Sequence, residues 1–107
     1  MPKELITVLQ TMDTRMETIR SIKDLCDELF MSQSTLLRLF RRYLGVSPHQ
    51  YLEARRLAMA RIYIKQGRRV TETALKTGFA DTSAFIRLFH RRFGMTPLKD
   101  RQTNFSG

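Results

Sequence analysis

The chain has 107 residues, of which 42% are apolar, enough for one modest domain or two very small ones and too many for wholesale disorder. No apolar run approaches the roughly 18 residues that span a membrane, and the N-terminus carries charges where a signal peptide needs an unbroken apolar stretch. The single cysteine excludes an internal disulfide, which fits a reducing compartment, and without a signal peptide we expect a cytoplasmic protein.

The net charge of +9 points to a polyanionic partner, and nucleic acid is favoured over a merely solvated basic surface. We therefore expect the protein to be associated with the nucleoid. The charge is uneven along the chain. Residues 1–37 hold four Lys/Arg and six Asp/Glu, whereas residues 38–107 hold fifteen and four. The positive excess therefore begins at residue 38, about a third of the way along the 107-residue chain.

The first third of the chain predicts three helices. Ser21 is a predicted N-cap for the second helix, with Asp24 at the third position of a capping box. Ser32 is predicted to cap a third helix, which runs to about Leu44 and ends at Gly45 in a left-handed conformation. The first helix is predicted from apolar residues at helical spacing, namely Leu5, Val8, Leu9, Met12, Met16 and Ile19.

The segment Ser47-Pro48-His49-Gln50 is a strong helix start, with a serine cap, proline in the first turn and a glutamine that can reach back. It predicts a long helix to about Gln66. Shorter helices follow, with predicted boundaries at Gly67 (stop), Thr71 or a neighbour (restart), Gly78 (stop), Asp81 (cap), Gly94 (stop) and Thr96-Pro97 (a last start). No strand pattern competes, so we expect an all-α fold.

A twelve-residue phrase occurs twice, as LRLFRRYLGVSP at 37–48 and as IRLFHRRFGMTP at 86–97. Coincidence between two Arg-rich amphipathic helices is the weaker explanation, and we interpret the copies as two versions of one structural unit. The identical pairs, 49 positions apart, are Arg38/Arg87, Leu39/Leu88, Phe40/Phe89, Arg42/Arg91, Gly45/Gly94 and Pro48/Pro97.

Each repeated helix has an apolar face and a basic face. The inward faces are predicted to be Leu36, Leu39, Phe40 and Tyr43, and Phe85, Leu88, Phe89 and Phe93. The outward faces are predicted to be Ser34, Leu37, Arg38 and Arg41, and Ser83, Ile86, Arg87 and His90. An outward arginine can make two hydrogen bonds to guanine in a major groove. Leu37 and Ile86 either contact a thymine methyl group or pack at the edge of their own unit.

A helix-turn-helix unit consists of a short helix, a turn and a basic amphipathic helix, in that order. This order occurs twice in the chain. We expect one unit in residues 1–46, a linker helix in 47–66 and a second unit in 67–107. A linker of about 28 Å can hold two reading helices near the roughly 34 Å that separates successive major-groove faces.

Residues 22–101 resemble the DNA-binding domain of the AraC/XylS family of bacterial transcriptional regulators. The strongest part is GFADTSAFIRLFHRRFGMTP, residues 78–97, and the first half matches more loosely. The resemblance implies about seven helices with two helix-turn-helix units. It puts base-reading residues at Ser34, Leu37, Arg38, Thr82, Ser83, Ile86 and Arg87. Neighbouring or phosphate-contacting residues are Ser32, Gln33, Thr35, Arg41, Ser47, Thr71, His90 and Arg91.

Three positions depart from the family pattern. Phe30 stands where the first turn usually has a small residue, so that unit is expected to be set differently. Cys26 stands at a position usually held by alanine, a mild change. Asp100-Arg101 replaces the usual Tyr-Arg, so the final helix is expected to pack poorly.

The residues support no enzyme: no catalytic constellation, zinc-ligand spacing or Gly-rich phosphate loop occurs. We expect no cofactor, no metal and no small-molecule site within this chain, and any effector or oligomerisation domain would lie outside it. The predicted function is a sequence-specific transcriptional regulator, an activator, that binds double-stranded DNA, with RNA polymerase as a second candidate partner. The alternatives are a nonspecific or architectural DNA binder and a basic protein-interaction module.

Overall fold

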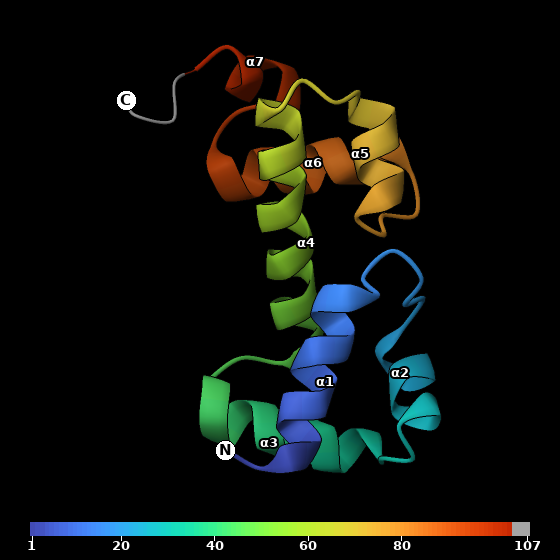
Figure 1. The fold of residues 1–107 in the computed structure, drawn as a ribbon. Coiled ribbons are helices and arrows are strands. Elements are labelled where there is room, and N and C mark those ends of the chain that lie inside the picture. The colour runs from blue at the N-terminus through green and yellow to red at the C-terminus, as the bar shows by residue number, and fades with distance from the viewer. Residues whose placement is uncertain (104–107) are drawn as a thin grey trace. The chain divides into compact units, whose positions relative to one another are not determined.

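The computed structural model describes residues 1–103, and these residues form seven helices and no strands. The number of helices and the all-α class agree with the sequence prediction (Figure 1). The helices are α1 (Lys3–Thr14), α2 (Ile22–Glu28), α3 (Gln33–Leu44), α4 (Pro48–Lys65), α5 (Val70–Lys76), α6 (Thr82–Phe93) and α7 (Pro97–Arg101). The chain divides into two compact units, Met1–Arg55 and the part from Arg56 onward, so α4 contributes residues to both.

In the first unit, α1 and α2 pack against α3 (Figure 1). The Phe40 ring meets the Tyr51 ring of α4 edge-on, with 5.7 Å between ring centroids. Asp13 of α1 accepts a hydrogen bond from Arg55 at 2.9 Å, which joins α1 to the start of α4. The buried apolar residues of this unit are Leu5, Val8, Met12, Met16, Ile19, Leu25, Cys26, Leu36, Phe40 and Leu52.

The first helix ends earlier than the apolar spacing predicts. α1 stops at Thr14, yet Met16 and Ile19 beyond it are both buried. A turn follows, in which the amide of Ile19 donates to the carbonyl of Arg15 at 3.2 Å. The prediction was wrong about the helix because an apolar residue needs burial, and a turn that folds back onto the core provides it as well as a helix does.

In the second unit, a row of phenylalanines forms the centre of the core. The centroids of successive rings, Phe79, Phe85, Phe89 and Phe93, lie 5.1, 5.6 and 4.7 Å apart. Tilted and edge-on pairs of this kind add to the stabilisation that comes from burial alone. Phe85 and Phe89 are buried, and Phe79 and Phe93 are partly buried against them. The other buried members of the cluster are Leu57, Ala60, Ile64 and Ala74.

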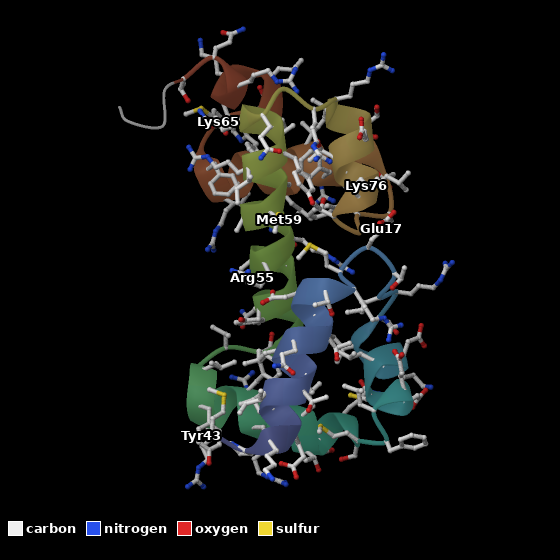
Figure 2. The ribbon with its side chains drawn as sticks, in the orientation of Figure 1. Glu17, Tyr43, Arg55, Met59, Lys65 and Lys76 are labelled. Atoms are coloured by element: carbon white, nitrogen blue, oxygen red, sulfur yellow. The ribbon has the colours of Figure 1, made fainter. Side chains whose placement is uncertain are left out.

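The last helix is fixed by an ionic clamp. Asp100 is fully buried and accepts two hydrogen bonds from the Arg61 guanidinium, at 3.1 and 2.9 Å, and the Lys65 ammonium lies 3.6 Å away. Lys65, at the end of α4, also donates to the Thr103 carbonyl at 2.7 Å (Figure 2). The expectation of poor packing for α7 was therefore wrong, because Arg61 and Lys65 lie one helical turn apart on α4 and meet the carboxylate together.

The predicted caps form. The side chains of Ser21, Ser32 and Asp81 accept hydrogen bonds from backbone amides in the first turns of α2, α3 and α6. Ser47 and Gln50 cap one another reciprocally, at 3.1 and 2.9 Å. α5 has no side-chain cap, because Arg69 precedes it and Thr71 lies inside its first turn. These local signals are reliable because each satisfies an amide that the helix itself leaves unpaired.

Candidate nucleic-acid interface

α3 and α6 are built alike, and each is the second helix of a helix-turn-helix unit. Both have twelve residues, and both end at a glycine in the left-handed conformation, Gly45 with φ 71° and Gly94 with φ 79°. Leu36 and Phe40 face the first core, as Phe85 and Phe89 face the second. Burying one face holds the other face of each helix toward solvent.

The outward face of α3 is free to meet a ligand. Ser34, Arg38 and Arg41 are exposed, and Leu37 keeps 40% of its surface exposed. Gln33 is exposed as well, at the start of the helix. These are small and basic groups around one apolar side chain, which is a composition suited to a major groove.

The side chains of Ser32 and Thr35, at the start of α3, are partly engaged in capping this helix. Thr35 is half-buried, and its amide donates to the Ser32 hydroxyl at 3.1 Å. That hydroxyl in turn donates to the Thr35 hydroxyl oxygen at 2.9 Å. Of the two hydroxyl hydrogens, only that of Thr35 is therefore left to donate to a phosphate oxygen.

The outward face of α6 is similar but not identical. Ser83, Arg87, His90 and Arg91 are exposed, whereas Thr82 is half-buried. Ile86 is partly buried and packs against the second core cluster. Leu37 and Ile86 thus occupy the same place in the repeat with different surroundings.

The inward face of α3 needs one correction. Tyr43 was predicted to be buried, but 42% of its surface is exposed, and Figure 2 shows it projecting from the end of the first unit. The Arg42 guanidinium lies 5.6 Å from the centroid of the Tyr43 ring. Leu44 is the half-buried residue at the end of α3, and it matches Phe93 in the second copy. The fourth inward position is therefore eight residues from Leu36 rather than seven, as the 3.6-residue turn allows.

The turns before the two helices share one hydrogen-bonding pattern. The amide of Met31 donates to the Cys26 carbonyl at 2.9 Å, and that of Phe79 donates to the Ala74 carbonyl at 3.0 Å. This six-to-one bond closes both α2 and α5, with Phe30 and Gly78 in the left-handed position. Despite Phe30, the first turn keeps this geometry, and it is one residue shorter than the second.

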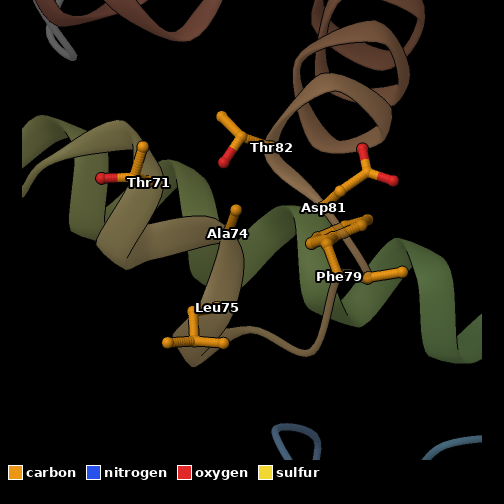
Figure 3. Close-up of a pocket in the computed structure, with 7 residues that line it drawn as sticks. Thr71, Ala74, Leu75, Phe79, Asp81 and Thr82 are labelled. Carbon is orange, nitrogen blue, oxygen red and sulfur yellow. The ribbon is translucent and has the colours of Figure 1, made fainter.

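A shallow hollow of about 200 Å³ lies between α5 and the start of α6. Figure 3 shows Thr71 and Leu75 on one side and Phe79, Asp81 and Thr82 on the other. Its lining has no cation and includes the carboxylate of Asp81, which caps α6 by accepting a hydrogen bond from the amide of Ala84. A phosphate group is therefore disfavoured inside the hollow, which Thr71 helps to line.

The arginines on the outward faces of α3 and α6 have no carboxylate counterion among the described residues. Within residues 1–103, no carboxylate lies within ion-pair distance of Arg38, Arg41, Arg87 or Arg91. Several acidic groups are instead engaged away from α3 and α6, such as Glu28 with Arg15. A basic surface without counterions is complementary to a phosphate backbone.

Other classes of site find no support in the described part of the chain. No group of His, Cys, Asp or Glu side chains among residues 1–103 could hold a metal ion. Within the same residues, no helix combines the length and the apolar composition that a membrane crossing requires.

Two short-helix, turn and basic-helix units, each with exposed arginines on its second helix, define a helix-turn-helix DNA-binding domain. The comparisons identify the family. Residues 25–103 match the family described as "Helix-turn-helix domain". The chain belongs to the AraC family of transcriptional regulators and corresponds to its DNA-binding domain.

The chain is similar to several curated regulators. It is 37% identical over 79 residues to the HTH-type transcriptional activator RhaS of Escherichia fergusonii, which covers 73% of this chain and 28% of that protein. It is 32% identical over 80 residues to the probable transcriptional regulator LumQ of Photobacterium leiognathi, covering 74% of this chain and 32% of LumQ. The matched region thus spans about a third of these relatives.

Solved structures agree on the fold. The DNA-binding domain of AdpA, a global transcriptional factor crystallised with a target DNA, is 26% identical with a TM-score of 0.86, covering 94% of this chain and 91% of that one. An AraC-type regulator from Chromobacterium violaceum is 28% identical with a TM-score of 0.80, covering 92% and 88%.

Proposed function

We propose that this chain binds a defined double-stranded DNA sequence in the bacterial cytoplasm and activates transcription from a nearby promoter. The single observation that carries the proposal is the repeated reading face, with exposed Arg38 and Arg87 at matching positions of two capped, amphipathic helices. RhaS, a relative, is named a transcriptional activator, which supports activation.

We propose that α3 and α6 each enter a major-groove segment. Arg38 and Arg87 are long enough to donate two hydrogen bonds to the O6 and N7 atoms of a guanine. Ser34, Ser83 and Thr82 lie earlier on the helices, where short side chains allow close approach to the bases. Leu37 supplies an apolar contact for a thymine methyl group, and Ile86 supplies a smaller one because it is partly committed to the core.

The remaining polar residues are assigned to the phosphate backbone, which positions the protein without reading sequence. Arg41, His90 and Arg91 are exposed on the flanks of the reading helices. The other candidates lie at or near helix N-termini, where backbone amides also face an anion, and they are Ser32, Gln33, Thr35, Ser47 and Thr71.

The test compares two arginines on one helix. Arg87→Ala is expected to weaken binding to a duplex selected from a random pool by about 1–3 kcal/mol and to relax the preference at one base pair. Arg92→Ala is the matched control, because Arg92 is also exposed on α6, five residues away and on another face. Both variants remove one positive charge, so long-range attraction falls equally in both.

Fluorescence anisotropy against the selected duplex and a scrambled duplex separates the outcomes. A loss for Arg87→Ala on the selected duplex alone supports base reading. Equal losses on both duplexes would contradict base reading by Arg87. Equal affinity of the unmodified protein for the selected and the scrambled duplex would indicate a nonspecific, architectural binder. Absence of duplex binding by the unmodified protein at low salt would favour a protein-interaction module.

A further inference from the structure

Phe30 is an aromatic residue that the fold does not use. It exposes 97% of its surface, more than any other large apolar residue in the described part of the chain. Neither a ring contact nor a cation over its ring is present among residues 1–103. The ring therefore contributes almost nothing to the core, and its hydration is unfavourable.

The backbone at Phe30 is also unfavourable for this residue type. Its φ of 55° makes it the only described non-glycine residue with a positive φ. A side chain in the left-handed region is strained, and the second unit has Gly78 in the equivalent place, at φ 91°. Glycine would serve the turn better, so the phenyl ring is not explained by folding.

The position of Phe30 is continuous with the proposed DNA interface. It lies two residues before Ser32, the cap of α3, and the exposed Gln33 and Ser34 follow directly. The nearest acidic groups in sequence do not present free charge to a DNA strand. Asp27 pairs with Lys23 at 2.9 Å, and Glu28 pairs with Arg15.

We propose that Phe30 makes an apolar contact with DNA at the edge of the segment read by α3, against a thymine methyl group or the adjacent deoxyribose. This inference rests on the proposed function. Both groups are uncharged C–H surfaces that an aromatic ring covers well, and a phenylalanine can contact a thymine methyl in this way. A contact with a thymine methyl would extend the base sequence read by the first unit beyond the reach of Ser34, Leu37 and Arg38, whereas a contact with deoxyribose would add affinity alone.

Two substitutions separate the role of the ring from the role of the fold. Phe30→Ala removes the ring, and Phe30→Gly removes both the ring and the strain. On the duplex selected by the unmodified protein, both are expected to bind about three- to tenfold more weakly. The melting temperature of Phe30→Gly should equal or exceed that of the unmodified protein, so its weaker binding cannot come from poor folding.

The control is Leu98→Ala, which removes another exposed apolar side chain, 59% exposed, on α7 of the second unit. It should leave the dissociation constant unchanged. The salt dependence of binding should also be the same for the unmodified protein and both Phe30 variants, because an apolar contact displaces no counterion. A shallower slope in the Phe30 variants would contradict an apolar contact.

Deoxyuridine substitution separates the two apolar groups. Replacing one thymidine at a time removes only the methyl group. A replacement that weakens the unmodified protein but not Phe30→Ala supports contact with that methyl. If every replacement affects both proteins equally while Phe30→Ala still binds weakly, the deoxyribose is the contact.

The outcome that overturns the proposal is unchanged DNA binding by both Phe30 variants while Arg38→Ala weakens it. If those variants then also reduced transcription from a promoter carrying the selected site, the ring would contact a protein instead. Failure of the proposed function looks different, because the unmodified protein itself would then bind selected and scrambled duplexes equally.

Discussion

Leu37 and Ile86 are the apolar side chains on two otherwise polar faces, and they occupy matching positions of the repeat. Leu37 keeps 40% of its surface exposed, whereas Ile86 packs against the core of the second unit. A residue that is already packed gains less from contact with DNA, because less of its surface is still in water. At the scale of single residues, Ile86 therefore contributes more to the stability of its unit than Leu37 does, and Leu37 has more surface available for the proposed contact with DNA.

Alanine substitutions should separate these roles. Ile86→Ala is expected to lower the free energy of unfolding by about 1–2 kcal/mol, since part of a core contact is lost. Leu37→Ala should change it by less than about 0.5 kcal/mol. Leu37→Ala should instead lose preference for thymine at one position of the selected site. Thermal unfolding by circular dichroism and binding to single-base variants measure both effects, and equal destabilisation by the two substitutions would contradict this account.

Cys26 is a buried thiol, and burial together with the neighbouring Asp27 charge raises its pKa. Because the pKa of Cys26 is higher in the folded state, its neutral thiol contributes to the stability of the fold at neutral pH. This contribution to stability is lost as the pH rises through the raised pKa. At pH 8 the native thiol should react with a disulfide reagent at least about tenfold more slowly than the unfolded thiol. A native rate equal to that of the unfolded chain would show that this part of the core opens freely.

The helices themselves follow from local rules, and the sequence predicts them well. The reciprocal Ser47–Gln50 cap and the Gly45 and Gly94 stops form as predicted, because each signal acts within a few residues. Where burial depends on packing between distant segments, the predictions were less accurate. Tyr43 lies at helical spacing yet stays exposed, since Leu44, eight residues from Leu36, takes the inward position instead.

The clamp on α7 shows the same limit more clearly. From the sequence alone, Asp100 is a poor substitute for the tyrosine usual at this position. Its partners, Arg61 and Lys65, lie more than thirty residues earlier, and only the fold brings them to its carboxylate. Among the residues proposed to contact bases, the sequence predicted exposed positions for Ser34, Arg38, Ser83 and Arg87, and the structure has them exposed. Which base each one meets depends on the DNA, and their contacts remain predictions.

Removing the carboxylate of Asp100 should release α7. Asp100→Ala leaves two cations facing each other without a counterion, and we expect a loss of about 2–4 kcal/mol in the free energy of unfolding, below the usual value for a fully buried pair because Arg61 is partly exposed. Lys99→Ala, at an exposed neighbouring position, should change it by less than about 0.5 kcal/mol. Denaturant unfolding measures both. Similar, small losses for the two variants would mean that the clamp does not stabilise the helix.

At the scale of the whole molecule, the chain carries the same device twice in 107 residues. Each unit has its own core, its own turn and its own exposed arginine, so each presents its own candidate surface for DNA. We propose that both units read bases. If so, the site should have two separable parts, each dependent on a different unit.

Random-pool selection followed by binding to single-base variants tests this claim most directly, with the unmodified protein, Arg38→Ala and Arg87→Ala compared on the same duplexes. We predict two groups of specified base pairs about one helical turn apart, with Arg38→Ala relaxing one group and Arg87→Ala relaxing the other. A single group of specified base pairs, or loss of the same base pairs in both variants, would contradict the account.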